Sequence, residues 1–71
     1  MPSEKVTVKA NGENKHITLP CSLLEFLTFS GWKATQVVVE YNGSVLPRNR
    51  LRDVQLKEGD QLEVIVPVAG G

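Results

Sequence analysis

Residues 22–27 read SLLEFL, and this stretch decides the fold because here the spacing of apolar residues becomes helical. Leu23, Leu24 and Leu27 form an apolar stripe, with Phe26 adding to its edge. Ser22 and Glu25 fit a capping box, in which each side chain accepts a hydrogen bond from the other residue's amide. Gly31 suits the left-handed position that closes a helix, which gives it about two or three turns. So short a helix must gain stability by packing on a sheet.

The residues before this helix predict a β-hairpin. Residues 5–9 (KVTVK) and 16–19 (HITL) alternate between polar and apolar, as expected for strands with one buried face. Asn11-Gly12 lies between them and is a strong turn signal. The alternation predicts that the apolar residues of both runs face the core; these are Val6, Val8, Ile17 and Leu19.

The residues after the helix predict a second hairpin and a final strand. Residues 37–41 (VVVEY) favour a strand, which ends at the Asn42-Gly43 turn, and a short strand at 45–46 ends at Pro47. Residues 48–57 are expected to form an irregular connection anchored by Leu51, Val54 and Leu56. A tight turn at Glu58-Gly59-Asp60 leads into the last strand at residues 61–66 (QLEVIV).

This order predicts an α+β domain with one mixed sheet of four to five strands and the helix across one face. The first and last strands carry inward valines and should be parallel neighbours in the centre of the sheet, which is the β-grasp (ubiquitin-like) arrangement. We expect residues 1–66 to form the domain and residues 67–71 to form a flexible C-terminal tail ending in Gly-Gly. A chain of 71 residues has room for one small domain.

The last five residues predict a tail built to enter another protein. Pro67 has no N–H to donate, so it ends the ladder, and Val68, Ala69, Gly70 and Gly71 are small and uncharged. Because glycine lacks a Cβ, a narrow catalytic channel can admit the backbone and bring a reagent to the terminal carboxylate. We therefore assign Gly71 as the reactive terminus, Gly70 to passage through the channel, and residues 67–69 to a partner groove. An incidental Gly-Gly end is the alternative.

Composition argues against several classes of protein. Eight basic and eight acidic residues cancel, so no strong field favours nucleic acid or an anionic membrane. A single cysteine excludes an internal disulfide and fits a reducing compartment, while the polar start and the lack of a long apolar run predict a cytoplasmic protein. The connection after Pro47 contains three arginines, which form either a solvated loop or a site for an acidic partner: Arg48, Arg50 and Arg52.

The side chains that could carry chemistry do not predict independent catalysis. His16 lies on the outward phase of its strand without a second metal ligand, and no nucleophile–base pair or phosphate-binding glycine loop is present. Cys21 precedes the helix, so it is either a reactive thiolate favoured by the helix dipole or a hydrophobic staple against Phe26. Val38 and Ile65 should share the outer sheet face, either as a docking patch or as ordinary exposed residues. Trp32 is expected to cover the core.

Taken together, these segments resemble the ThiS family, the sulfur carriers of thiamine thiazole synthesis. The resemblance rests on VEYNGSVLPR at 39–48, KEGDQLEV at 57–64 and the VAGG ending, with NGE at 11–13 and LLEFL at 23–27 in corresponding places. Leu51 departs from the family, which often has an aromatic residue there. The PVAGG ending also looks like the small subunit of molybdopterin synthase, the sulfur carrier for molybdenum cofactor, and that alternative stays open. A ubiquitin-like protein modifier and a plain interaction module are further alternatives.

The resemblance implies a mechanism in which the chain is a protein co-substrate and not an enzyme. A ThiF-like adenylating enzyme would use ATP and Mg²⁺ to adenylate the Gly71 carboxylate, and the carrier itself would bind no cofactor. Sulfur from a persulfide donor protein would then displace AMP and leave a thiocarboxylate. A ThiG-like thiazole synthase would take that sulfur into the thiazole ring.

Overall fold

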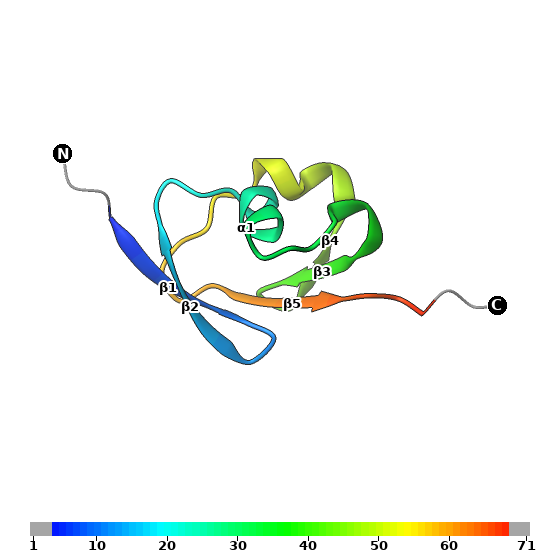
Figure 1. Cartoon of the computed structure of the whole chain (residues 1–71), viewed down its shortest axis with the longest axis horizontal. Coiled ribbons are helices and arrows are strands. Elements are labelled where there is room, and N and C mark those ends of the chain that lie inside the picture. The colour runs from blue at the N-terminus through cyan, green and yellow to red at the C-terminus, as the bar shows by residue number, and fades with distance from the viewer. Residues whose placement is uncertain (1–3, 69–71) are drawn as a thin grey trace.

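A five-stranded sheet carries the helix on one of its faces in the computed structural model, which describes residues 4–68 (Figure 1). The elements in chain order are β1 (Lys5–Ala10), β2 (Glu13–Thr18), α1 (Leu23–Phe29), the 3₁₀ helix η1 (Ala34–Gln36), β3 (Val38–Tyr41), β4 (Ser44–Leu46), the 3₁₀ helix η2 (Arg48–Asp53) and β5 (Gln61–Ile65).

The strand order β2-β1-β5-β3-β4 confirms the predicted β-grasp fold. β1 and β5 lie side by side and parallel in the centre, while the other neighbouring strands are antiparallel. The parallel contact is short, because only two pairs, Lys9–Gln61 and Ala10–Leu62, are in register. β5 is therefore the strand that joins the two hairpins into one sheet.

Helix α1 has the predicted ends. The Glu25 amide donates to the Ser22 hydroxyl at 3.0 Å, and the Ser22 amide donates to the Glu25 carboxylate at 2.8 Å. At the other end, Gly31 has a positive φ, and the amides of Gly31 and Trp32 donate to the carbonyls of Thr28 and Leu27. This pair of bonds is a Schellman motif, so the seven-residue helix has both ends capped.

The buried face of α1 differs from the expected stripe. Leu23, Phe26 and Leu27 are buried, whereas Leu24 is only half-buried and lies beside η1 and η2. Phe26 is thus in the core, and Leu24 takes the edge position that we expected for Phe26. The reason is rotational: residues three and four apart share a helix face, so Leu23 brings Phe26 and Leu27 inward and turns Leu24 aside.

The first hairpin is longer than predicted. β2 begins at Glu13, not at residue 16, because Asn11 and Gly12 both have positive φ and form a two-residue turn that pairs Ala10 directly with Glu13. Val6 and Val8 are buried as expected. Ile17, on the edge strand β2, and Leu19, which follows that strand, pack against the core but stay half-buried.

The two 3₁₀ helices were missed in the sequence, since one or two turns of 3₁₀ helix are too short to show an apolar periodicity. η2 occupies the first part of the connection predicted to be irregular. Its predicted anchors hold nevertheless: Leu51 and Leu56 are buried, and Val54 packs against the core from a half-buried position.

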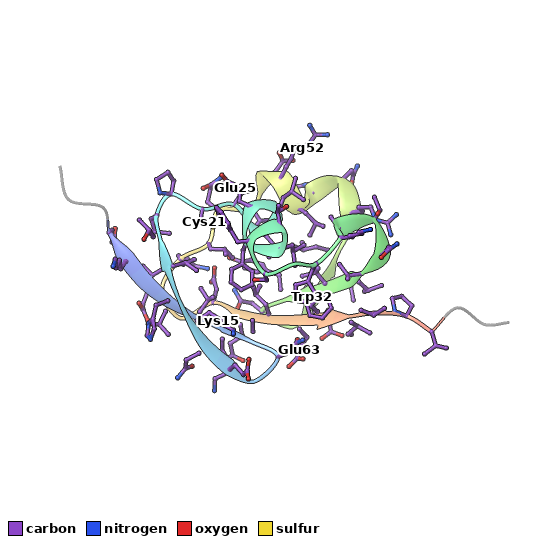
Figure 2. The ribbon with its side chains drawn as sticks, viewed as in Figure 1. Lys15, Cys21, Glu25, Trp32, Arg52 and Glu63 are labelled. Carbon is purple, nitrogen blue, oxygen red and sulfur yellow. The ribbon has the colours of Figure 1, made fainter. Side chains whose placement is uncertain are left out.

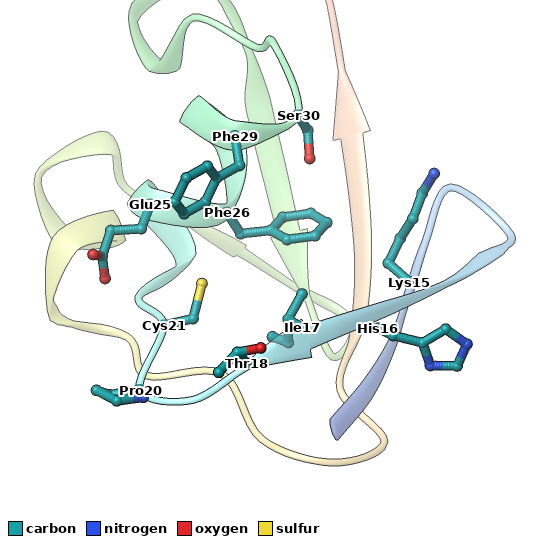
Figure 3. Close-up of a pocket in the computed structure, with 10 residues that line it drawn as sticks. All are labelled: Lys15, His16, Ile17, Thr18, Pro20, Cys21, Glu25, Phe26, Phe29 and Ser30. Atoms are coloured by element: carbon teal, nitrogen blue, oxygen red, sulfur yellow. The ribbon is translucent and has the colours of Figure 1, made fainter. Parts of the chain in front are cut away.

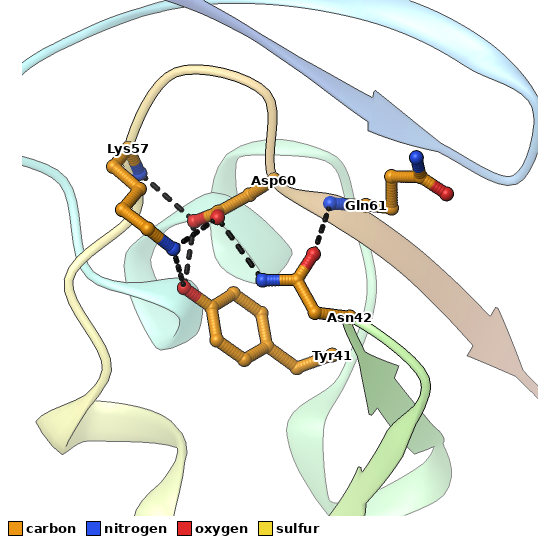
Figure 4. A network of polar contacts seen from close by, with 5 residues as sticks. All are labelled: Tyr41, Asn42, Lys57, Asp60 and Gln61. Carbon is orange, nitrogen blue, oxygen red and sulfur yellow. Dashed lines mark hydrogen bonds and ion pairs between the residues drawn. The ribbon is translucent and has the colours of Figure 1, made fainter.

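A buried carboxylate holds the turn before β5 (Figure 4). Asp60 is 2% exposed and accepts hydrogen bonds from Tyr41 Oη at 2.7 Å and from the Lys57 ammonium at 2.6 Å. It also accepts from the Lys57 amide and from Asn42 Nδ2. Burial by itself would raise the pKa of Asp60, but these donors outweigh it and the pKa is lowered. The sequence predicted only a turn at this position.

Replacing this carboxylate tests its contribution to stability. Asp60→Asn keeps the shape but loses the charge-assisted bonds, so we expect the free energy of unfolding at pH 7 to fall by about 2 kcal/mol. Because the folded pKa lies below the ordinary value of 3.8, the wild-type carboxylate stabilises the fold above that pH. This stability is lost as pH falls below that value and through the folded pKa. Urea unfolding at a series of pH values measures both effects.

Asp53→Asn is the matched control, because Asp53 forms only an exposed pair with Arg50 at 3.8 Å. It should change the free energy of unfolding by less than about 0.5 kcal/mol. Equal effects of the two substitutions would contradict the role assigned to Asp60.

Candidate functional site

The chain leaves the sheet at the end of β5 and continues as an exposed segment. Ile65 is the last strand residue; Val66, Pro67 and Val68 belong to no strand, and Val68 is 93% exposed. In Figure 1 this segment runs outward from the body of the molecule. Ala69, Gly70 and Gly71 lie outside the described residues, so their assigned roles stay predictions, as does the division into a domain and a flexible tail.

Asn11, in the first hairpin turn, holds β5 on the β1 side. The Asn11 amide donates to the Leu62 carbonyl at 2.9 Å. The side chain then binds both main-chain groups of Val64: Oδ1 accepts from the Val64 amide at 2.7 Å, and Nδ2 donates to the Val64 carbonyl at 3.2 Å. The Asn11 carboxamide thus takes the place of a main-chain peptide group where β1 has ended.

Asn42, in the second hairpin turn, does the same at the start of β5. Its amide donates to the Gln61 carbonyl at 2.8 Å, and its Oδ1 accepts from the Gln61 amide at 2.8 Å (Figure 4). Sequence reasoning took both asparagines only as turn residues. The available signal was their chemistry: unlike aspartate, asparagine can both donate and accept. The strand that leads into the tail is therefore fixed by two turns that are distant in sequence.

Val38 and Ile65 share the outer face of the sheet, opposite the helix, as predicted. They are directly paired across β3 and β5 and are 36% and 43% exposed. Val45, on β4, is also exposed and is paired with Glu40 on the same face. The outer face therefore has an apolar patch beside the point where the chain leaves the sheet; its role in docking stays a prediction.

Cys21 does not have the surroundings of a reactive thiolate. It is buried in the same core cluster as Phe26, which fits the staple interpretation. Burial and the neighbouring Glu25 carboxylate both raise the pKa of the thiol, so the neutral form is favoured. Cys21 borders a groove of about 530 Å³ between β2 and α1, lined by apolar side chains such as Phe26 and Phe29 and by polar ones such as Glu25 (Figure 3).

The remaining candidate residues from the sequence lie away from the end of β5, where the chain leaves the sheet. The His16 ring contacts Thr7 Oγ1 at 3.0 Å, and residues 4–68 contain no group of three His, Cys, Asp or Glu that could hold a metal ion. The arginines Arg48, Arg50 and Arg52 lie on η2, and Arg48 Nε donates to the Ala34 carbonyl at 3.0 Å. Figure 2 shows Arg52 and Glu63 on opposite sides of the molecule. Trp32 packs on the core in a half-buried position, as expected. Over the described part of the chain, no helix has the length and apolar character needed to span a membrane.

A pair of substitutions tests the two asparagine contacts. Asn11→Gly tolerates the positive φ but removes the carboxamide, so the Val64 amide loses its acceptor and should exchange its hydrogen faster. Asn42→Gly should instead expose the Gln61 amide. Hydrogen exchange followed by NMR distinguishes the two variants, with each serving as the control for the other. Unchanged exchange at Val64 in Asn11→Gly would show that the carboxamide does not hold β5.

Comparison with known proteins identifies the family. Residues 8–71 match the sequence pattern of the ThiS family. A crystal structure of the thiamine biosynthesis protein ThiS from Geobacter metallireducens superposes with a TM-score of 0.80 at 28% identity, covering 93% of this chain and all of that one (100%). A solution structure of a thiamine biosynthesis protein from the same organism gives a TM-score of 0.75 at 28% identity, over 93% of this chain and 88% of that one. No curated protein matches the chain. The chain belongs to the ThiS family, whose members are small sulfur carriers and not enzymes.

Proposed function

We propose that this chain carries sulfur as a thiocarboxylate on Gly71 for thiazole formation in thiamine biosynthesis. One observation supports this most directly. In a chain of the ThiS family, the central strand β5 is fixed on both sides and continues into an exposed segment that leads to Gly70-Gly71. A rigid strand followed by a slim terminus can present its carboxylate to another protein's active site.

The proposed chemistry uses no residue of the folded domain as a catalyst. An adenylating partner would join the Gly71 carboxylate to AMP and release pyrophosphate from ATP, with Mg²⁺ bound by that partner. The terminal sulfur of a persulfide donor would attack the acyl carbon, and AMP would leave with the bonding electron pair. A thiol would then cleave the remaining sulfur–sulfur bond, leave the thiocarboxylate on Gly71 and become part of a disulfide. A thiazole synthase would finally take the sulfur.

Burial of Cys21 supports an external sulfur donor. Its thiol is held in the core with a raised pKa, so it is poorly suited to attack an acyl adenylate.

The apolar pair Val38–Ile65 supplies the proposed docking face for the adenylating partner, with Val68 and Pro67 following into its groove. Exposed apolar residues clustered within polar surroundings are typical of such a site.

Removal of the last residue tests the reactive terminus. With a ThiF-like adenylating enzyme, ATP, Mg²⁺ and a persulfide donor, the full chain should gain the mass difference between sulfur and oxygen. Deletion of Gly71 should abolish this gain, because the carboxylate no longer reaches the adenylation site. Intact-mass spectrometry measures the gain, and an unchanged melting temperature shows that the fold survives. A truncated chain that is modified equally well would disprove the assignment.

The acceptor enzyme separates the proposed pathway from the molybdenum-cofactor alternative. Thiazole synthase should consume the thiocarboxylated chain, whereas the large subunit of molybdopterin synthase should not. Stable amide adducts on lysines of other proteins would instead favour the ubiquitin-like modifier.

Alanine substitution tests the docking face. The double variant Val38→Ala, Ile65→Ala should weaken binding to the adenylating enzyme about tenfold, because the apolar contact area is lost. Phe29→Ala is the matched control, since Phe29 is 85% exposed but belongs to α1, on the other side of the sheet. Calorimetric titration gives the affinities. An equal loss in the control, or no loss in the double variant, would place the docking face elsewhere.

A further inference from the structure

The outer sheet face carries two glutamates at directly opposed positions of the β3–β5 ladder, and neither forms an ion pair among the described residues. Glu40 on β3 is directly paired with Glu63 on β5, one step along the same face from the Val38–Ile65 pair. The ion pairs found within residues 4–68 are all elsewhere: Lys15–Glu13, Arg50–Asp53 and Lys57–Asp60. Like charges directly opposite in an antiparallel ladder are destabilising, so this arrangement costs the free carrier stability.

Exposed apolar side chains of the same face lie beside the two carboxylates, and the Lys9–Gln61 pair lies beyond Glu63 along β5. Ile65 and Val38 lie on one side, and Val45 is paired with Glu40 from β4. Figure 2 shows Glu63 on the side of the sheet away from α1. Because neighbouring residues on one face of a sheet are within reach of a single long side chain, one partner residue can contact the carboxylates and the apolar groups together.

The inference rests on the proposed function and specifies the partner surface that fits this face. We propose that the adenylating enzyme places a basic side chain, arginine or lysine, between Glu40 and Glu63, with apolar groups around it that contact Val38, Ile65 and Val45. The cation would relieve the repulsion that exists in the free carrier. It would also set the register of docking, because the two carboxylates mark one position on the face.

A basic side chain fits better than other cations. Ca²⁺ takes more oxygen ligands than two carboxylates offer, and the part of the chain that the structure describes has no third acidic, His or Cys residue grouped with them. Mg²⁺ keeps most of its water shell, so it would leave the apolar side chains beside the carboxylates uncovered. Arginine presents parallel N–H donors that match carboxylates, while its aliphatic stem covers apolar surface. Ile65 is six residues before Gly71, so an extended tail places the carboxylate at most about 20 Å away, within reach of the same partner.

Neutralising the carboxylates separates a binding role from a structural one. Glu40→Gln and Glu63→Gln keep side-chain shape, so in the free carrier each should raise the melting temperature, by about 2 °C, as the repulsion is removed. In calorimetric titration with the adenylating enzyme, each should weaken binding about tenfold. The affinity should also fall less steeply with NaCl concentration than that of the wild type.

Glu13→Gln is the matched control, because Glu13 is an exposed carboxylate on β2, at the far edge of the sheet. It should leave binding to the enzyme unchanged. Wild-type affinity and salt dependence in both glutamine variants would overturn the inference, as would a loss of binding that accompanies a fall in melting temperature. If those variants are still adenylated normally, the proposed function survives that failure. If the wild-type chain is neither bound nor adenylated, the proposed function fails and the inference falls with it.

Discussion

The hydrogen bonding of β5 on both of its edges is the constraint on which the rest of the structure depends. β3 pairs with it along one edge, from Leu62 to Ile65. On the other edge β1 contributes two register pairs, and Asn11 continues the contact to Val64. Without β5 the two hairpins would share no strand, and the helix would have no continuous surface to cover. A strand held in this way also fixes where the chain leaves the sheet and in which direction it points.

The two faces of the sheet differ in what covers them. One is covered by α1 and buries the residues of the core cluster, including Leu23, Leu27 and Leu62. The other has no covering element among residues 4–68, and it carries Val38, Ile65 and the two opposed glutamates beside the start of the exposed segment. A domain this small buries only about 60% of the surface of its unfolded chain, so one sheet face can stay uncovered without loss of the core. The face and the tail can therefore serve one partner together.

A network of hydrogen bonds and one ion pair lies at the start of β5. The Asp60 carboxylate joins Tyr41 and Asn42 from the second hairpin to Lys57 from the preceding turn. Burial and donation by Lys57 and Tyr41 act in opposite directions on the pKa of Asp60, and donation prevails. This polar network is fully paired, and the described residues contain no buried side-chain polar atom without a partner. A satisfied network of this kind favours one arrangement of the turn and so one register of β5.

Much of the fold could be predicted from the sequence, because local sequence patterns determine local backbone geometry. Alternation, the Asn-Gly turns, the Ser22–Glu25 capping box and Gly31 were sufficient to predict the hairpins, the helix and the parallel central strands. Tertiary structure decided which apolar residue of the helix is buried in the core and which lies at its edge. It also decided that the two turn asparagines bind β5, that Asp60 is buried, and that Glu40 is paired with Glu63. These features depend on contacts between residues far apart in the chain. Spacing along a sequence determines which face a side chain occupies, but register across strands determines what it meets there.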